Sequence, residues 1–394
     1  MKARSMKLVW VYLLTAALAA CGGGSSGGSG GGNPPASPPT SIKLAQTGQI
    51  VSYDTNTVTP GDDGALKKGV AWPSPRFTLA VAGSGVVITD NLTGLMWASD
   101  GNAPGPVACT PGTTKAWQAA LDYVACLNTN SYLGYTDWRL PNVIELESLG
   151  NMGEVNSATW LNGLGFTNVQ PTAYWSSTTV TSNTAQAWSV FMDVIEPFAV
   201  TKSVNNYVLP VRTGQNTTPP AMLPQTGQLV SYDTNTTSPG DDGALKKGFA
   251  WPTTRFTLAV AGSGVVVTDN LTSLMWTRDG NTPGPVGCGP ATAKTWQAAL
   301  DYAACLNTNS YLGYTDWRLP NIKELRSLAN AGESNTTTWL IARGFTNVLT
   351  SPYWSSTTTA ANTGNAYYMS LIDGAVGWNT KASAATVWPV RGGQ

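Results

Sequence analysis

Short runs of β-branched and aromatic residues, separated by breaks rich in Gly, Asn and Ser, recur along the chain. Such runs at 85–89, 174–180 and 187–192 predict short β-strands. Apolar residues recur at i, i+4 and i+7 along 115–127, which predicts a helix with one buried stripe. Asn142 follows a proline and heads an Asn-x-x-Glu capping box, which predicts a second short helix. The pattern therefore predicts an α+β fold, with two helices against a set of short, mostly antiparallel strands.

The whole pattern occurs twice. Residues 44–213 and 223–392 align at a constant offset of 179 with no insertion or deletion. A unit of this length is too long for a solenoid repeat and has the size of a complete domain. We therefore predict two domains, each with its own core, over 42–213 (copy one) and 222–394 (copy two). The predicted linker between them covers 214–221.

The two copies have diverged unevenly. Residues 125–142 and 304–321 are identical at all eighteen positions. Residues 186–209 and 365–388 agree at only four of twenty-four positions. Two explanations remain open. Exposed strands and loops drift faster than a core, or this segment forms a ligand face whose specificity differs between the copies.

The N-terminus has the pattern of an export signal. A basic start, an apolar stretch over 8–19 and the sequence Leu18-Ala19-Ala20-Cys21 predict a lipoprotein signal peptide over 1–20. The last four of these residues resemble the bacterial lipobox, so we expect a lipid on Cys21 to anchor the chain to a membrane. The apolar stretch is too short to favour a transmembrane helix. Residues 21–41, rich in Gly, Ser and Pro, predict a tether. Because no Asp follows the cysteine, we expect the outer membrane of the cell envelope, with surface exposure.

Charge and composition exclude some classes of function. The chain has 22 basic and 22 acidic residues, and three of the basic ones fall in the predicted signal peptide, so the remainder is weakly acidic. Such a surface attracts polyanions weakly, so we expect no nucleic-acid binding. The chain contains no histidine, which removes the commonest general base and zinc ligand. We therefore expect a protein that is not an enzyme, although carboxylate chemistry remains open.

The five cysteines divide into one for lipid and one pair in each copy. Cys109 and Cys126 have the same spacing as Cys288 and Cys305. In the oxidising space outside the cytoplasm, a pair repeated in this way predicts a disulfide within each domain. A redox-active or nucleophilic pair is the alternative.

Both copies contain the same motifs in the same order. In copy one they are Asp90-Asn-Leu-Thr-Gly-Leu-Met-Trp97, Cys109, Trp117, Cys126, Asp137-Trp-Arg-Leu-Pro141, Glu145-Leu146, Tyr174-Trp-Ser-Ser177 and Pro210-Val-Arg212. This set resembles the Lcl C-terminal domain family of bacterial surface proteins and lipoproteins. The resemblance implies a C-type-lectin-like fold, as in collagen-like adhesins that bind sulfated glycans. The Arg-Leu-Pro stretch is also similar to that of the formylglycine-generating enzyme, but no cysteine follows Cys126 or Cys305 within its copy to supply that enzyme's redox-active pair.

Tryptophans are the main candidates for ligand contact. Five that recur in both copies are predicted to lie in the core: Trp97, Trp117, Trp138, Trp160 and Trp175. Trp188, Trp378 and Trp388 are not retained as Trp at the matching position. Because aromatic faces stack on sugar rings, these three are candidate ligand-binding residues. Core packing is the alternative for each.

Charged residues support two further predictions. Arg139 is expected to pair with a carboxylate and brace the turn before the second helix, although a charged catalytic cluster is the alternative. The turn Gly61-Asp-Asp-Gly64, with Asp54 upstream, is a candidate calcium loop, or an ordinary Asp-Gly turn. No other cofactor or metal is expected.

We therefore expect a lipid-anchored surface protein with two non-catalytic lectin-like modules, for adhesion or for recognition of a glycan or another ligand on a host or neighbouring surface. Sulfated glycans fit less well, because neither copy has a strongly basic cluster. The alternatives are a structural envelope lipoprotein, a lectin-fold receptor for a protein partner with variation in 365–388, and a carboxylate-dependent hydrolase.

Overall fold

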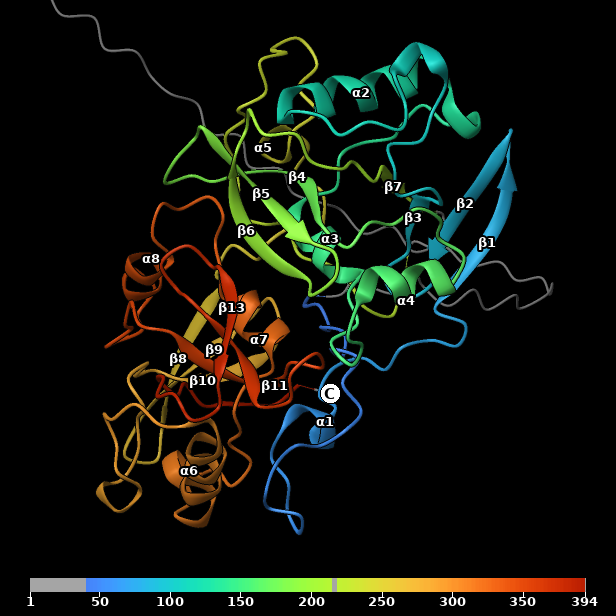
Figure 1. Ribbon diagram of the computed structural model, residues 1–394. Helices are drawn as coiled ribbons and strands as arrows, with labels where there is room; N and C mark the ends of the chain where they lie inside the picture. Colours follow the sequence, from blue (N-terminus) through green and yellow to red (C-terminus); the bar gives the residue numbers. More distant parts are fainter. Residues whose placement is uncertain (1–39, 215–217, 394) are drawn as a thin grey trace, which may run out of the picture. The chain divides into compact units, whose positions relative to one another are not determined.

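The computed structural model describes residues 40–214 and 218–393, and the elements of copy one recur in copy two (Figure 1). The helices of copy one are α1 (Asp63–Leu66), α2 (Trp117–Thr129), α3 (Val143–Ser148) and α4 (Ser157–Gly163), with 3-10 turns η1 (Val107–Cys109) and η2 (Tyr132–Gly134). Its strands are β1 (Phe77–Ala82), β2 (Gly85–Asp90), β3 (Leu95–Ala98), β4 (Ala173–Thr179), β5 (Gln186–Phe191), β6 (Glu196–Thr201) and β7 (Val211–Thr213). The predicted signal peptide, Cys21 and all but the end of the predicted tether lie outside the described residues.

Copy two repeats this succession. Its helices are α5 (Asp242–Leu245), α6 (Trp296–Thr308), α7 (Ile322–Ser327) and α8 (Thr336–Ala342), with 3-10 turns η3 (Val286–Cys288) and η4 (Tyr311–Gly313). Its strands are β8 (Phe256–Ala261), β9 (Gly264–Asp269), β10 (Leu274–Thr277), β11 (Tyr353–Thr358), β12 (Asn365–Met369), β13 (Val376–Thr380) and β14 (Val390–Arg391). The duplication found in the sequence is therefore a duplication of structure.

Each copy contains two small antiparallel sheets. In copy one, β1, β2, β3 and β7 form the first sheet in that order, and β4, β5 and β6 form the second. Strand β7 returns from the end of the copy to pair with β3, so that Arg212 lies opposite Met96. Copy two has the corresponding sheets β14-β10-β9-β8 and β11-β12-β13. The predicted α+β class is confirmed, and the finer lectin-like assignment stays a prediction.

The predicted helices and strands lie within about two residues of their expected ends. The helix expected over 115–127 is α2, and the capping box headed by Asn142 starts α3. Helices α1 and α4 were not predicted, so the described part of copy one has four helices where two were expected. Helix α4 shows why. It is seven residues long and consists largely of small and polar residues. Asn156 caps it by accepting a hydrogen bond from the Thr159 N–H at 2.9 Å.

A disulfide joins η1 to α2 in copy one, and its counterpart joins η3 to α6. Cys109 bonds to Cys126, and Cys288 bonds to Cys305. The predicted pairing is therefore confirmed. Closing a loop of 17 residues stabilises a fold by about 3 kcal/mol in the chain-entropy model.

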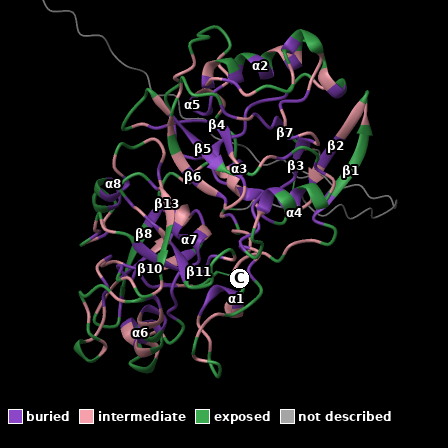
Figure 2. Ribbon diagram, viewed as in Figure 1, coloured by how far each residue is buried: buried purple, intermediate pink, exposed green. Residues whose placement is uncertain are grey.

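The core consists of three clusters of buried side chains, and buried residues are prominent along β4 and β5 (Figure 2). One cluster lies within copy one and one within copy two, while the third contains residues of both copies. The described residues of both copies accordingly belong to a single compact unit. Of the five tryptophans of copy one predicted to lie in the core, four are buried and Trp160 is half-buried.

Arg139 braces the turn before α3, as predicted. Its guanidinium donates two hydrogen bonds of 2.6 Å to the two carboxylate oxygens of Glu145. The same carboxylate accepts the backbone N–H of Asn142, so one buried ion pair fixes the start of the helix. Arg318 and Glu324 form the matching pair in copy two.

Candidate functional site

The three tryptophans that the copies do not share lie in different environments. Trp188 on β5 is 3% exposed and Trp388 is fully buried, so neither ring faces solvent. Trp378 on β13 is 51% exposed. Of the three candidate ligand-binding residues, Trp378 is therefore the one that presents its ring at the surface. Ligand contact itself stays a prediction.

At each of the two buried tryptophans, the other copy has a smaller side chain. Copy two has Tyr367 where copy one has Trp188, and copy one has Leu209 where copy two has Trp388. All four side chains are buried. In copy two the Trp388 ring packs edge-on against Trp276, with ring centroids 5.6 Å apart. A bulkier residue at one position accompanies a smaller one at the other, and burial favours core packing as the role of Trp188 and Trp388.

Trp378 lines a cleft of about 160 Å³ whose walls come from both copies. Copy two contributes β12, β13 and the turn 359–362, and copy one contributes residues 151–157 and 193–194. The polar side chains around it include Asn151, Glu154, Asp193, Thr359, Asn362 and Asn365. The cleft is smaller than the pockets that hold drug-sized ligands, so it suits a single ring or a short side chain.

The charge of this cleft is negative. Its lining residues include Glu154 and Asp193 but no lysine or arginine. Tyr367 donates a hydrogen bond of 3.1 Å to the Val194 carbonyl, which connects β12 to copy one. Nearby, burial raises the pKa of Glu196 to about 7, and Asp193 adds to the rise. A neutral ligand fits this environment better than a sulfated one, because like charges repel.

Copy one presents a different surface at the matching place. Ala199 stands where copy two has Trp378. Instead, the rings of Phe191 and Phe198 stack face to face with centroids 4.1 Å apart, and Phe191 is 36% exposed. Neither phenylalanine has an aromatic counterpart in copy two. The diverged segment therefore places different aromatic side chains at the surface in the two copies.

A larger groove in copy two, of about 740 Å³, was not anticipated from the sequence. Trp251, Trp339 and Tyr232 contribute aromatic surface to it. The half-buried Trp251 is held in place because its indole N–H donates to the Gln225 carbonyl at 2.8 Å, and the Arg255 guanidinium lies 4.2 Å from its ring centre. Trp251 precedes the family motifs, but Trp recurs at the matching position of copy one. That recurrence in the sequence could have marked Trp251 as a residue worth examining.

In the turn Gly61-Asp-Asp-Gly64, the candidate calcium loop, Asp62 caps α1. The Asp62 carboxylate accepts hydrogen bonds from the Ser52 hydroxyl and from two backbone N–H groups. The Asp54 carboxylate likewise accepts two backbone N–H groups. These hydrogen bonds show both carboxylates fixing the turn, the role that an ordinary Asp-Gly turn predicts. Among the residues described, no three acidic or cysteine side chains are grouped so that they can hold a metal ion.

No helix in the described part of the chain has the length and apolar character needed to span a membrane.

Comparison with known proteins gives one match. The sequence pattern of the Lcl C-terminal domain matches residues 86–212 and again residues 265–391, which together make up more than half of the chain. Each match begins at β2 or β9 and ends in β7 or β14, so it contains the disulfide, the Arg-Glu pair and the diverged segment. No match was found among curated proteins.

Proposed function

Because the chain belongs to the Lcl C-terminal domain family and carries two copies of its domain, we propose that it is a non-catalytic binding protein with two lectin-like modules. A lipid on Cys21 would anchor it to the cell envelope, in the outer membrane and exposed at the surface. Its role would be adhesion, through recognition of a glycan on a host or neighbouring surface.

The exposed ring of Trp378 is the observation that carries this proposal. A half-exposed indole beside amide and carboxylate side chains offers an apolar face for a sugar ring and hydrogen-bonding groups for its hydroxyls. The acidic lining favours neutral sugars over sulfated ones. The different aromatic surface of copy one predicts that the two modules do not share one ligand.

A glycan array with the lipid-free chain tests the proposal, read with and without a calcium chelator. Neutral glycans are expected to bind, and Trp378→Ala, which introduces the residue of copy one, should weaken binding about tenfold. Val260→Ala is the matched control, because Val260 on β8 is 86% exposed and lies outside the lining of the cleft. Loss of binding in chelator would add a metal to the proposal.

Two results would contradict it. Failure of the intact chain to bind any glycan would favour a protein partner or a structural role in the envelope. Equal binding by the Trp378→Ala variant and the unaltered chain would place the ligand elsewhere, with the Trp251 groove as the next site to test.

A further inference from the structure

Two matching segments cross between the copies. We call them arm one (residues 44–68) and arm two (residues 223–247). Asp63 of arm one accepts a hydrogen bond of 2.7 Å from the Thr357 hydroxyl of copy two. Asp242 of arm two accepts one of 2.7 Å from the Thr178 hydroxyl of copy one. Each arm therefore bonds to the copy to which it does not belong by sequence.

A glutamine in each arm makes a second reciprocal contact. The Gln49 amide donates to the Thr358 carbonyl at 2.9 Å and accepts the Thr358 N–H at 3.1 Å. The Gln228 amide makes the same two bonds with Thr179, at 2.8 and 3.0 Å. Contacts in which residue i meets residue j and j meets i characterise a two-fold pair of subunits. Here the two subunits are halves of one chain.

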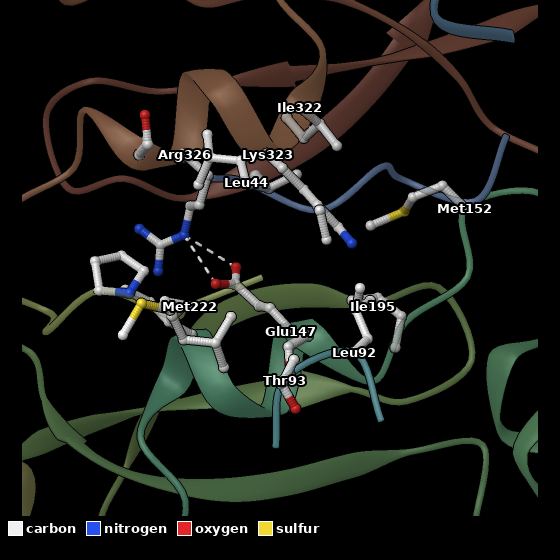
Figure 3. A pocket seen from close by; sticks show the side chains of 17 residues that line it. Leu44, Leu92, Thr93, Glu147, Met152, Ile195, Met222, Ile322, Lys323 and Arg326 are labelled. Carbon is white, nitrogen blue, oxygen red and sulfur yellow. Dashed lines mark hydrogen bonds and ion pairs between the residues drawn. The ribbon is translucent and has the colours of Figure 1, made fainter. Parts of the chain in front are cut away.

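At the centre of this pair, matching positions meet each other. Glu147 on α3 and Arg326 on α7 differ in number by the repeat offset of 179. The Arg326 Nε donates to both carboxylate oxygens of Glu147, at 2.9 and 3.2 Å (Figure 3). The two side chains are only 11% and 14% exposed. Two identical copies would bring the same charge together at this point.

The surroundings strengthen the effect of that charge. The ion pair lies at a small pocket of about 80 Å³ whose lining is largely apolar and includes Leu44, Met152 and Met222 (Figure 3). In such surroundings an unpaired or like-charged group is costly, because water cannot screen it. Lys323 lies at the same pocket, and its counterpart in copy one is Ile144, so a pair of second copies would place two lysines there beside the two arginines.

We propose that this face is a recognition surface for an Lcl domain of the opposite type. Copy one binds copy two through the exchanged arms and rejects another copy one, since Glu147 would meet a second glutamate. Copy two rejects another copy two, since Arg326 would meet a second arginine. The partner of the surface is therefore the complementary copy, and like-charge repulsion at one buried position sets the choice. This inference is independent of any glycan ligand.

The test cuts the folded full chain at a protease site inserted after Gly214. We expect the two halves to remain a one-to-one pair on size exclusion after cleavage. Glu147→Arg or Arg326→Glu should speed their dissociation about 100-fold or more, because each places like charges at the buried centre. The double reversal restores an opposite pair and should recover most of the loss. Val81→Arg is the control, since it adds a charge at an 86% exposed position on β1.

Glu147→Gln keeps the test informative if a reversal variant fails to fold. It removes the charge with little change of shape and should speed dissociation about tenfold. Separation of the unaltered halves immediately after cleavage would overturn the proposal. Equal dissociation of single and double reversals would also overturn it, since the arms would then hold the pair without charge selection.

Discussion

Two stretches of each copy, only about 45 residues apart in sequence, have diverged to opposite extents. Residues 125–142 are identical to 304–321, and side chains in this stretch hydrogen-bond to its own backbone. The Asn128 side chain makes two hydrogen bonds to the backbone of Trp138, and the Trp138 indole donates to the Tyr132 carbonyl. Each of these bonds needs a particular donor and acceptor at a fixed distance. Few substitutions would preserve all of these hydrogen bonds.

The fold restricts the choice of residues less in the diverged stretch, 186–209 and its counterpart 365–388. At two of its buried positions the core needs volume, which Trp188 with Leu209 supplies in one copy and Tyr367 with Trp388 in the other. At its surface positions there is no packing requirement, and Trp378 is free to differ. The comparison teaches that the densely bonded stretch is kept whole, while the diverged stretch exchanges bulk, surface rings and even a buried hydrogen bond. In copy one the Asn206 amide donates to the Ser189 hydroxyl at 2.9 Å, where copy two has Ala385 and Tyr368.

The largest loss of stability should come from removing Arg139, which lies in the identical stretch and pairs with Glu145. Arg139→Met leaves Glu145 buried without its partner, so the free energy of unfolding should fall by about 3–5 kcal/mol. Arg318→Met should cost the same in copy two, as measured by urea denaturation. Asp137→Asn is the control, because its carboxylate is 53% exposed, and it should cost less than about 1 kcal/mol. Unequal losses in the two copies would contradict a shared framework role.

The stability of the protein should depend on pH through both arms in the same way, because each arm carries a buried aspartate. Burial raises the pKa of Asp63 from 3.8 to about 6, and Glu324 adds to the rise, while hydrogen bonds from Thr47 and Thr357 lower it. The folded protein thus holds this proton more tightly than the unfolded chain. The resulting stability is fully present below about pH 4 and is lost as the pH rises through about 6. The loss corresponds to about 3 kcal/mol.

Asp63→Asn should remove this slope, and Asp242→Asn should remove an equal one, because burial raises the pKa of Asp242 to about 6 as well. Thermal unfolding between pH 4 and 8 measures both. A slope that persists unchanged in the double variant would show that these two carboxyl groups do not cause it.

The buried part of the diverged stretch should respond to volume. Trp388→Leu introduces the residue of copy one and removes ring contacts with Trp276, Phe345 and Tyr353. We expect a loss of about 2–3 kcal/mol in the free energy of unfolding. Tyr367→Trp in the same chain adds back the ring that copy one carries at the other position and should recover part of it. No recovery would mean that the two positions do not compensate.

The exposed part of the stretch should affect stability least. Trp378→Ala removes a half-exposed ring and should change the free energy of unfolding by less than about 0.5 kcal/mol. The same variant is the one expected to lose glycan binding. A large loss of stability would instead assign Trp378 to packing.

Local patterns were enough to predict most of the fold. The helical stripe of α2, the capping box of α3, the disulfides and the Arg139–Glu145 pair all depend on residues within about 20 positions of each other. The sequence singled out three tryptophans as candidate ligand-binding residues. It could not show which two of them are buried, because burial depends on packing between strands that lie far apart in the chain. Nor could it show that Asp63 reaches Thr357, since 294 positions separate them and either copy could have supplied the partner.

The crossing of the arms also governs the order in which the chain matures. A chain emerging from its N-terminus completes the sequence of copy one at residue 213, yet Thr178 and Thr179 still lack the side chains that bind them. Those side chains belong to Gln228 and Asp242 and follow only later. During that interval an arm from a neighbouring molecule can occupy the same place, which is the route to swapped assemblies. A short linker shortens the interval and raises the local concentration of the correct arm, so the brevity of 214–221 protects against misassembly between chains.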